Sequence, residues 1–237
     1  MQLEAMAKLD LKKEAVLKRV YKISLNEADV AAEVQRIDAT TRAPAILAEI
    51  KTDLGNDPKR FADAVARPIL VERKLHAQFD DDVKLHAPQR AQAEHTRKRI
   101  LARQETNERI AVLKEKKNAG EVTWQLTPRA GAPPVTPIKI TTSSQSYSIA
   151  ATAQVAQASK WPEKESDGKF YFDDVEPDLQ KVLRVQLQKA GSVSAVIETP
   201  GAFLLFIAKE KTRNTLSVAS LSIPKRSYDE WLAQQPD

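Results

Sequence analysis

The chain has 237 residues, of which 42% are hydrophobic and 29% are charged, a balance typical of globular rather than disordered proteins. It contains no cysteine, which excludes disulfides, thiol nucleophiles and thiolate metal sites. The 37 lysines and arginines only slightly exceed the 32 aspartates and glutamates and are spread along the chain, which favours a solvated helical surface. No apolar segment reaches the length of a signal peptide or a membrane span.

The first half of the sequence predicts a helical module over residues 1–118. An amphipathic helix is expected over 4–22, a second behind a capping box at Ser24 and Glu27, and a short third helix over 45–54 that ends at Gly55.

Asp57 and Pro58 are typical of the start of a further helix, as N-cap and first helical residue. Pro68 must kink that helix or divide it in two. Its inner face is predicted from the near-helical spacing of five apolar residues, Phe61, Val65, Ile69, Leu75 and Phe79. After Pro88, one long polar helix is expected over 89–117, of the kind that bridges domains or is half solvated.

The strongest pattern lies in residues 170–211. Glu176-Pro177 opens a predicted helix whose apolar stripe is Leu179, Val182, Leu183 and Leu187, and Lys189-Ala190-Gly191 closes it. A short strand over 193–199, with Val193, Ala195 and Ile197 on one face, and a Pro200-Gly201 turn come next. The unbroken apolar run 202–208 then predicts a strand buried on both faces.

Within this segment, the sequence LQKAGSVSAVIETPGAFLLFI resembles the C-terminal half of the parvulin (PpiC-type) peptidyl-prolyl isomerases. Gly191, Val193, Ser194, Val196 and Thr199 match the family pattern position for position. In the last strand, however, the family histidine falls at Leu204, or at Phe203 with a turn one residue shorter. The strand expected over 121–126 also lacks the histidine that the family has there. The resemblance therefore implies a degenerate parvulin domain with no catalytic residue that can be named.

The helical half resembles, more loosely, the N-terminal part of SurA- and PrsA-like periplasmic chaperones. The resemblance rests on the LGNDPKRF turn and the RPILVERKL helix. Together the two likenesses imply an α+β protein with a helical chaperone-type module followed by a parvulin-like domain of a small antiparallel sheet with packed helices. They also imply a periplasmic or otherwise exported protein, whose export signal this sequence does not show.

The second predicted domain covers residues 119–237. It contains a proline-rich loop over 127–137, a brief strand over 138–142 and a helix of small residues over 149–158. A C-terminal extension over 215–235 adds a half-buried strand and a helix capped by Ser227, with Trp231 and Leu232 facing inward. The added strand is expected at a sheet edge or paired with another chain, which leaves a homodimer open.

No cofactor or metal is predicted. His76, His86 and His95 lack the spacing of a helical metal site, and the run from Asp80 to Asp82 lacks the spaced ligands of a calcium loop. Motifs of nucleotide binding and of serine hydrolases are also missing from the sequence.

The sequence therefore predicts a chaperone or foldase-like protein that binds unfolded or extended client polypeptides, with its Lys/Arg-rich helix favouring acidic clients. An active peptidyl-prolyl isomerase with an atypical site, and a basic helical module that binds nucleic acid, are the alternatives; neither nucleic acid nor a membrane span is the expected partner. The resemblance places six residues around a proline pocket for the client: Leu179, Leu183, Phe203, Leu205, Phe170 and Phe172. Packing in the core is the alternative interpretation of each of them.

Overall fold

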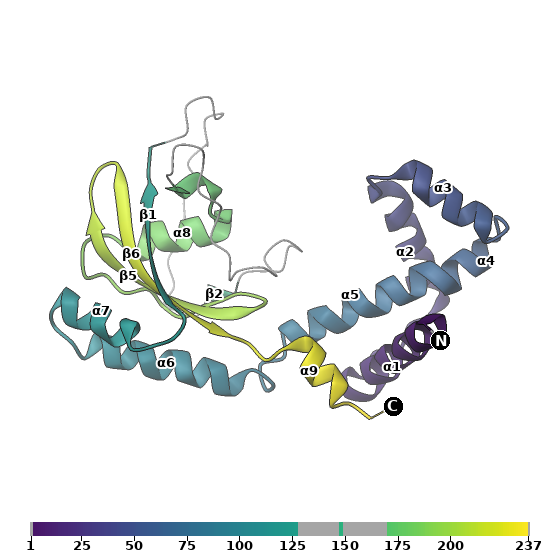
Figure 1. Ribbon diagram of the computed structural model, residues 1–237, viewed down its shortest axis with the longest axis horizontal. Coiled ribbons are helices and arrows are strands. Elements are labelled where there is room, and N and C mark those ends of the chain that lie inside the picture. Colours follow the sequence, from purple (N-terminus) through teal and green to yellow (C-terminus); the bar gives the residue numbers. More distant parts are fainter. Residues whose placement is uncertain (1, 128–146, 149–169, 237) are drawn as a thin grey trace. The chain divides into compact units, whose positions relative to one another are not determined.

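The computed structural model describes residues 2–127, 147–148 and 170–236. Helices and one mixed sheet give the predicted α+β fold (Figure 1). The chain divides into two compact units. Unit 1 consists of Met1–Asp82 and Ser227–Asp237, and unit 2 of Val83–Arg226. This division differs from the predicted boundary at residues 118 and 119, for reasons that the packing of each unit makes clear.

Unit 1 is helical throughout its described residues. Its elements are α1 (Gln2–Tyr21), α2 (Glu27–Thr40), α3 (Pro44–Asp53), α4 (Pro58–Phe61), a π-helical turn (Ala62–Ala66), α5 (Arg67–Asp80) and α9 (Tyr228–Ala233). Asp57 caps α4 by accepting the N–H groups of Lys59 and Arg60, as predicted. The capping box of α2 lies two residues later than predicted, at Asn26 and Asp29, whose side chains and backbone N–H groups bond reciprocally.

The π-helical turn explains why the predicted inner face of the fourth helix was only partly right. Pro68 has no N–H to offer the preceding turn, and the helix accommodates it with a wider turn just before it. The extra residue rotates the apolar face, so that Ala66 and Leu70 are buried whereas Ile69 is 41% exposed. Phe61, Leu75 and Phe79 are buried as expected.

Helix α9 packs on α1 and α5, so the C-terminus belongs to unit 1 rather than to the sheet. The Trp231 ring lies 6.1 Å from that of Tyr21 and 5.1 Å from that of Phe79, centroid to centroid. Ser227 caps the helix by accepting the N–H of Glu230, and Trp231 and Leu232 are buried, which confirms the prediction for this helix.

A polar cluster supports this packing. Glu72 accepts hydrogen bonds from Tyr228, at 3.4 Å, and forms ion pairs with Lys13, at 2.8 Å, and His76, at 3.2 Å. The His76 ring stacks on that of Tyr228, 3.6 Å between centroids. The hydrogen bonds from His76 and Lys13 outweigh burial and lower the pKa of Glu72 to about 2.

Unit 2 is built on a sheet of six strands within the described residues, in the order β2-β4-β5-β6-β1-β3. The strands are β1 (Ala119–Gln125), β2 (Tyr147–Ser148), β3 (Phe170–Tyr171), β4 (Ile197–Glu198), β5 (Ala202–Lys211) and β6 (Thr215–Pro224). The pairs β1–β3 and β2–β4 are parallel and the others antiparallel. The prolines of 128–137, and the strand and helix predicted over 138–142 and 149–158, lie outside the described residues.

Strand β5 is buried on both faces, which confirms the prediction from its unbroken apolar run. Every residue from Ala202 to Ala208 is buried. Strand β6 pairs with β5 on one side and with β1 on the other, so the added strand is central and not at a sheet edge.

Two layers of helices cover the sheet. Helix α8 (Pro177–Gln186), with a 3-10 turn (Phe172–Asp174), covers one face through its predicted stripe Leu179, Val182 and Leu183. Helices α6 (Ala87–Leu101) and α7 (Thr106–Lys114) cover the other face through apolar side chains such as Ile100, Ile110 and Leu113. These two helices therefore belong to unit 2, and the predicted domain boundary at residue 118 cuts through a layer of its core.

The single polar helix predicted over 89–117 is thus two helices. A continuous helix over these residues would be about 44 Å long, whereas two shorter helices place both of their apolar patches on the same sheet. No glycine or proline marks the break at residues 102–105.

The strand predicted over 193–199 is also shorter, since only Ile197–Glu198 pairs regularly with β5. Before it, the Ser194 side chain replaces a backbone partner, because its hydroxyl accepts the N–H of Phe206 at 3.0 Å and donates to the carbonyl of Ala195. Ser194 and Val196 are consequently buried, while Val193 and Ala195 are only half-buried.

The lowered pKa of Glu72 predicts an acid-sensitive step in unit 1. Because the pKa in the folded state lies at about 2, below the ordinary 4.5, the stabilisation is complete above about pH 4.5 and is lost as the pH falls towards 2. Between pH 7 and pH 3 the parent is therefore expected to lose more unfolding free energy than Glu72→Gln does, in urea titrations followed by tryptophan emission. Glu49→Gln, on the exposed side of α3, serves as control and should behave like the parent. Equal losses for all three proteins would contradict the role of Glu72.

The burial of Leu183 predicts a second outcome. Leu183 is 0% exposed between α8 and the sheet, so Leu183→Asp places an unpaired charge in the core and is expected to abolish the cooperative melting of unit 2. Ala190→Asp adds the same charge at an exposed position and is expected to melt like the parent. Thermal unfolding followed by circular dichroism distinguishes these results, and a normal transition for Leu183→Asp would show that this helix face is not core.

Candidate functional site

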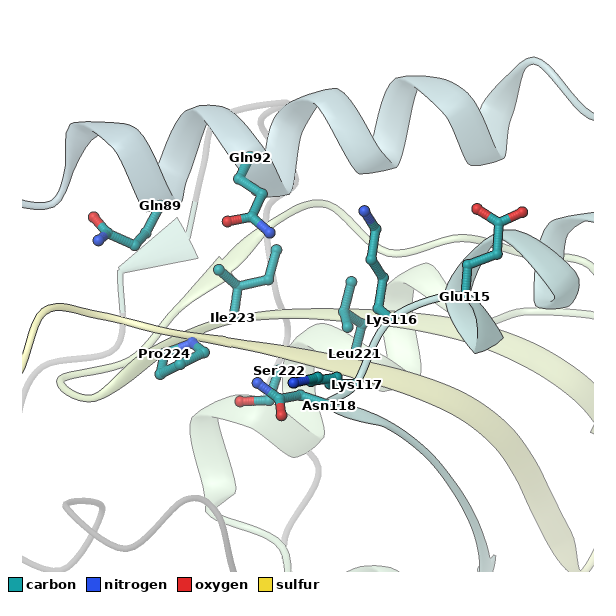
Figure 2. A pocket seen from close by; sticks show the side chains of 10 residues that line it. All are labelled: Gln89, Gln92, Glu115, Lys116, Lys117, Asn118, Leu221, Ser222, Ile223 and Pro224. Atoms are coloured by element: carbon teal, nitrogen blue, oxygen red, sulfur yellow. The ribbon is translucent and has the colours of Figure 1, made fainter.

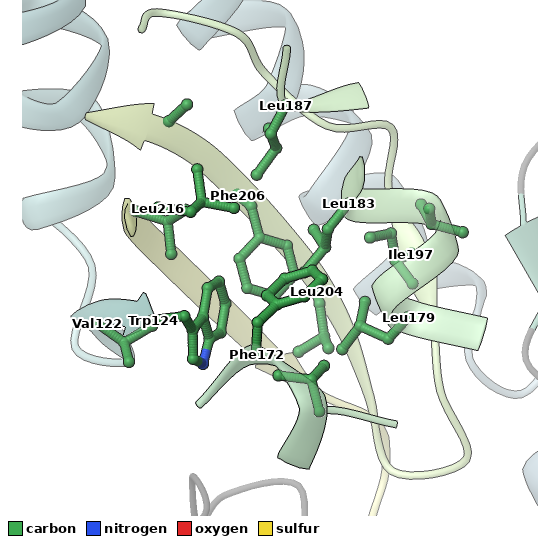
Figure 3. Close-up of a cluster of buried hydrophobic side chains, with 14 of the residues drawn as sticks. Val122, Trp124, Phe172, Leu179, Leu183, Leu187, Ile197, Leu204, Phe206 and Leu216 are labelled. Carbon is green, nitrogen blue, oxygen red and sulfur yellow. The ribbon is translucent and has the colours of Figure 1, made fainter. Parts of the chain in front are cut away.

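The six residues predicted to wall a proline pocket do not form one pocket. Leu179, Leu183 and Phe172 are buried in the core cluster between α8 and the sheet (Figure 3). Phe170 is partly buried and packs against this cluster. Phe203 and Leu205 are buried on the opposite face, against α6 and α7. Alternate residues of β5 point to opposite faces, which separates these two groups by the thickness of the sheet. In this arrangement all of them act as core.

Leu204 and Phe203, between which the resemblance leaves the place of a family histidine open, are both core residues. Leu204 is 6% exposed and lies in the same cluster as Trp124 of β1, which is 0% exposed and contacts the ring of Phe172 edge-on at 5.6 Å (Figure 3). Leu204 is thus surrounded by apolar packing, to which β1 contributes Trp124.

The three histidines are dispersed. His76 is paired with Glu72, His86 is buried and accepts the backbone N–H of Arg226 at 3.4 Å, and His95 is exposed on α6. Among the residues that the structure describes, no three His, Asp or Glu side chains lie together in a way that could hold a metal ion.

The arginines of α6 and α7 fasten the segment 191–198 to the helical layer. Arg97 donates to the carbonyl of Ser194 at 2.8 Å, Arg109 donates to the carbonyl of Gly191 at 2.7 Å, and Arg90 pairs with Glu198. Gly191 has φ +80°, and a Cβ there would lie 2.7 Å from Thr106 Oγ1. Close packing against α6 and α7 is therefore a sufficient local reason for a glycine at position 191 and a serine at position 194, both of which match the parvulin sequence pattern.

Glu198 lies at the centre of a compact charge cluster. It accepts hydrogen bonds from Arg90 and forms an ion pair of 2.9 Å with Lys225, whose side chain is only 2% exposed. Both cations lie over the ring of Phe203, at 5.2 Å for Arg90 and 5.5 Å for Lys225. One carboxylate thus faces two cations that both also lie over an aromatic ring.

Beside this cluster lies a groove of about 490 Å³, which we call the β6 groove (Figure 2). Its walls are Gln89 and Gln92 from α6 and the turn 115–118 between α7 and β1, and its floor is the end of β6, 221–224. Gln89 and Gln92 point from the helix towards β6 (Figure 2). The floor combines the buried apolar side chains of Leu221 and Ile223 with the polar edge of the strand.

Charge in the β6 groove is positive. Glu115 is paired with Arg99 at 3.0 Å, whereas Lys116 and Lys117 form no ion pair within the described part of the chain. The groove also contains a buried polar atom, Gln89 Oε1, that accepts no hydrogen bond from any described residue. Such an atom is costly to leave unpaired, and a ligand donor that reaches it recovers that free energy.

Sequence reasoning did not find the β6 groove. Its residues come from three segments that are far apart in the chain, and none of them forms a recognisable motif. The only local signal is the pair Lys116-Lys117 just before a predicted strand, which a solvated surface explains equally well.

No protein-family model, no curated protein and no solved structure matches this chain. Within the described ranges, no helix combines the length and apolar character that a membrane crossing requires.

The charge cluster leads to a stability prediction. Glu198→Gln removes the carboxylate that faces buried Lys225 and Arg90, and breaking such a pair costs about 3 kcal/mol. The free energy of unfolding of unit 2, from urea titration, is expected to fall by about this amount, whereas Glu210→Gln at an exposed position should change it by less than about 0.5 kcal/mol. A change for Glu198→Gln as small as that for the control would show that the cluster is not holding β4 to α6.

Proposed function

We propose that the protein is a folding chaperone that binds unfolded or extended client polypeptides without efficient peptidyl-prolyl isomerase activity. The proposal includes a periplasmic or otherwise exported location for the protein. The observation that carries it is helix α3, which contains two isoleucines and a leucine yet has no buried residue. Ile46 is 59% exposed and Ile50 37% exposed.

Helix α1 of unit 1 also exposes apolar side chains. Met6, Leu9 and Leu11 in its first half are 58%, 43% and 69% exposed. Large apolar side chains gathered on exposed helices are typical of surfaces that contact other polypeptides. Chaperone clients expose apolar segments, so this surface and its ligands match in chemistry.

Two observations on unit 2 support this function over its alternatives. An isomerase site of the parvulin type requires polar groups where Trp124 and Leu204 pack, which speaks for binding rather than catalysis. A nucleic-acid-binding helix requires free cations, whereas Arg90, Arg97, Arg99 and Arg109 are bonded within unit 2.

The proposal is tested in the refolding of a model protein whose folding is limited by proline isomerisation. The chain is expected to suppress aggregation in proportion to its concentration and to leave the slow proline phase unchanged, since uncatalysed isomerisation has a barrier of about 20 kcal/mol. Acceleration of that phase at substoichiometric amounts would establish an isomerase instead.

The exposed isoleucines of α3 allow a sharper form of this test. Ile46→Ser with Ile50→Ser removes apolar contact area worth about 2 kcal/mol when fully covered, so the concentration needed for half-maximal suppression should rise about thirtyfold. Melting should be unchanged, because neither side chain is buried. Glu49→Ser on the same helix is the control and should suppress aggregation like the parent. Suppression by the double variant equal to that of the parent would remove α3 from the client surface.

A further inference from the structure

The β6 groove has the chemistry of a binding site for a polypeptide backbone. Three side-chain amides, Gln89, Gln92 and Asn118, line it, and each amide carries both a donor and an acceptor, as a peptide bond does. The acceptor of Gln89 is buried and has no partner among the described residues, so it lacks the N–H that a bound backbone would supply.

The strand at the floor is open on one side. Strand β1 pairs with β6 only as far as Ala119 opposite Leu221, and the N–H of Ser222 then donates to the carbonyl of Asn118 at 3.2 Å. On its other side β6 remains paired with β5 out to Pro224. Residues 223–224 of β6 therefore lie beyond the end of β1, and no described strand pairs with them on that side.

The charges select among extended segments. Lys116 and Lys117 flank the groove without ion-pair partners in the described residues. A ligand with carboxylates is attracted, and a basic one is repelled.

From these observations we infer that the β6 groove binds an extended acidic peptide segment. Side chains alternate in an extended chain, so carboxylates at every second position of a bound segment can reach Lys116 and Lys117. The amides on the walls match a backbone better than a phosphate group, which would call for arginines or a nest of backbone N–H groups. None of the described residues that line the groove is aromatic, so these residues offer a base no ring on which to stack. This site lies in unit 2 and is separate from the apolar surface of α1 and α3, so it adds a second kind of recognition to the proposed function.

The experiment uses the full chain and a fluorescein-labelled, N-acetylated and C-amidated hexapeptide of alternating glutamate and valine, with binding measured by fluorescence anisotropy at low salt. The affinity is expected to fall about tenfold for Lys116→Gln with Lys117→Gln and about fivefold for Gln89→Leu. The same peptide with glutamine in place of glutamate should bind the parent about tenfold more weakly. Lys189→Gln removes an equal charge at an exposed position after α8 and should leave the affinity unchanged.

Several results would overturn the inference. Unchanged affinity in the double lysine variant, equal binding of the glutamine peptide, or complete displacement by inorganic phosphate or a short single-stranded oligonucleotide would each contradict an acidic-peptide site. The Ile46→Ser, Ile50→Ser variant separates this site from the client surface: it should retain peptide binding whether or not it still suppresses aggregation. Loss of peptide binding in that variant would place the peptide on unit 1 and overturn the groove assignment.

Discussion

The double burial of β5 is the constraint on which unit 2 depends. A strand with seven consecutive buried apolar residues is stable only when both faces of its sheet are covered. Helix α8 covers one face and lies close by in sequence, whereas the other face is covered by α6 and α7, which precede the sheet. The need to cover that second face explains why helices that look like part of an N-terminal module belong to the sheet unit.

The polarity of α6 and α7 follows from the same arrangement. Their apolar side chains are few because only one narrow stripe of each helix meets the sheet, and their arginines hold the irregular segment 191–198 in place of regular strand pairing. The arginines of α6 and α7 are therefore bonded to other residues of unit 2. Lys116 and Lys117, which line the groove at the end of β6, form no ion pair with a described residue.

The sequence predicted those features that local chemistry determines. The cap at Asp57, the stripe of α8, the buried run of β5 and the cap at Ser227 depend on residues close together in the chain, and all were right. The break between α6 and α7, the central place of β6 and the groove depend on contacts between distant segments, for which no local residue is diagnostic. The predicted inner face of this helix was wrong at Ile69, because a π-helical turn changes the helical period that the prediction assumed.

Unit 1 is formed by residues from both ends of the sequence, so unit 2 is inserted into unit 1 along the chain. Docking α9 onto α1 and α5 requires closing a loop as long as the whole of unit 2, which in a flexible chain costs about 4 kcal/mol. Once unit 2 has folded, its two ends are held together, since His86 near its start accepts the N–H of Arg226 at its end. The folded unit has then already closed the loop, so that α9 docks at much lower entropic cost. Folding of the sheet unit therefore favours completion of the helical unit, with no contact between the two units required for this coupling.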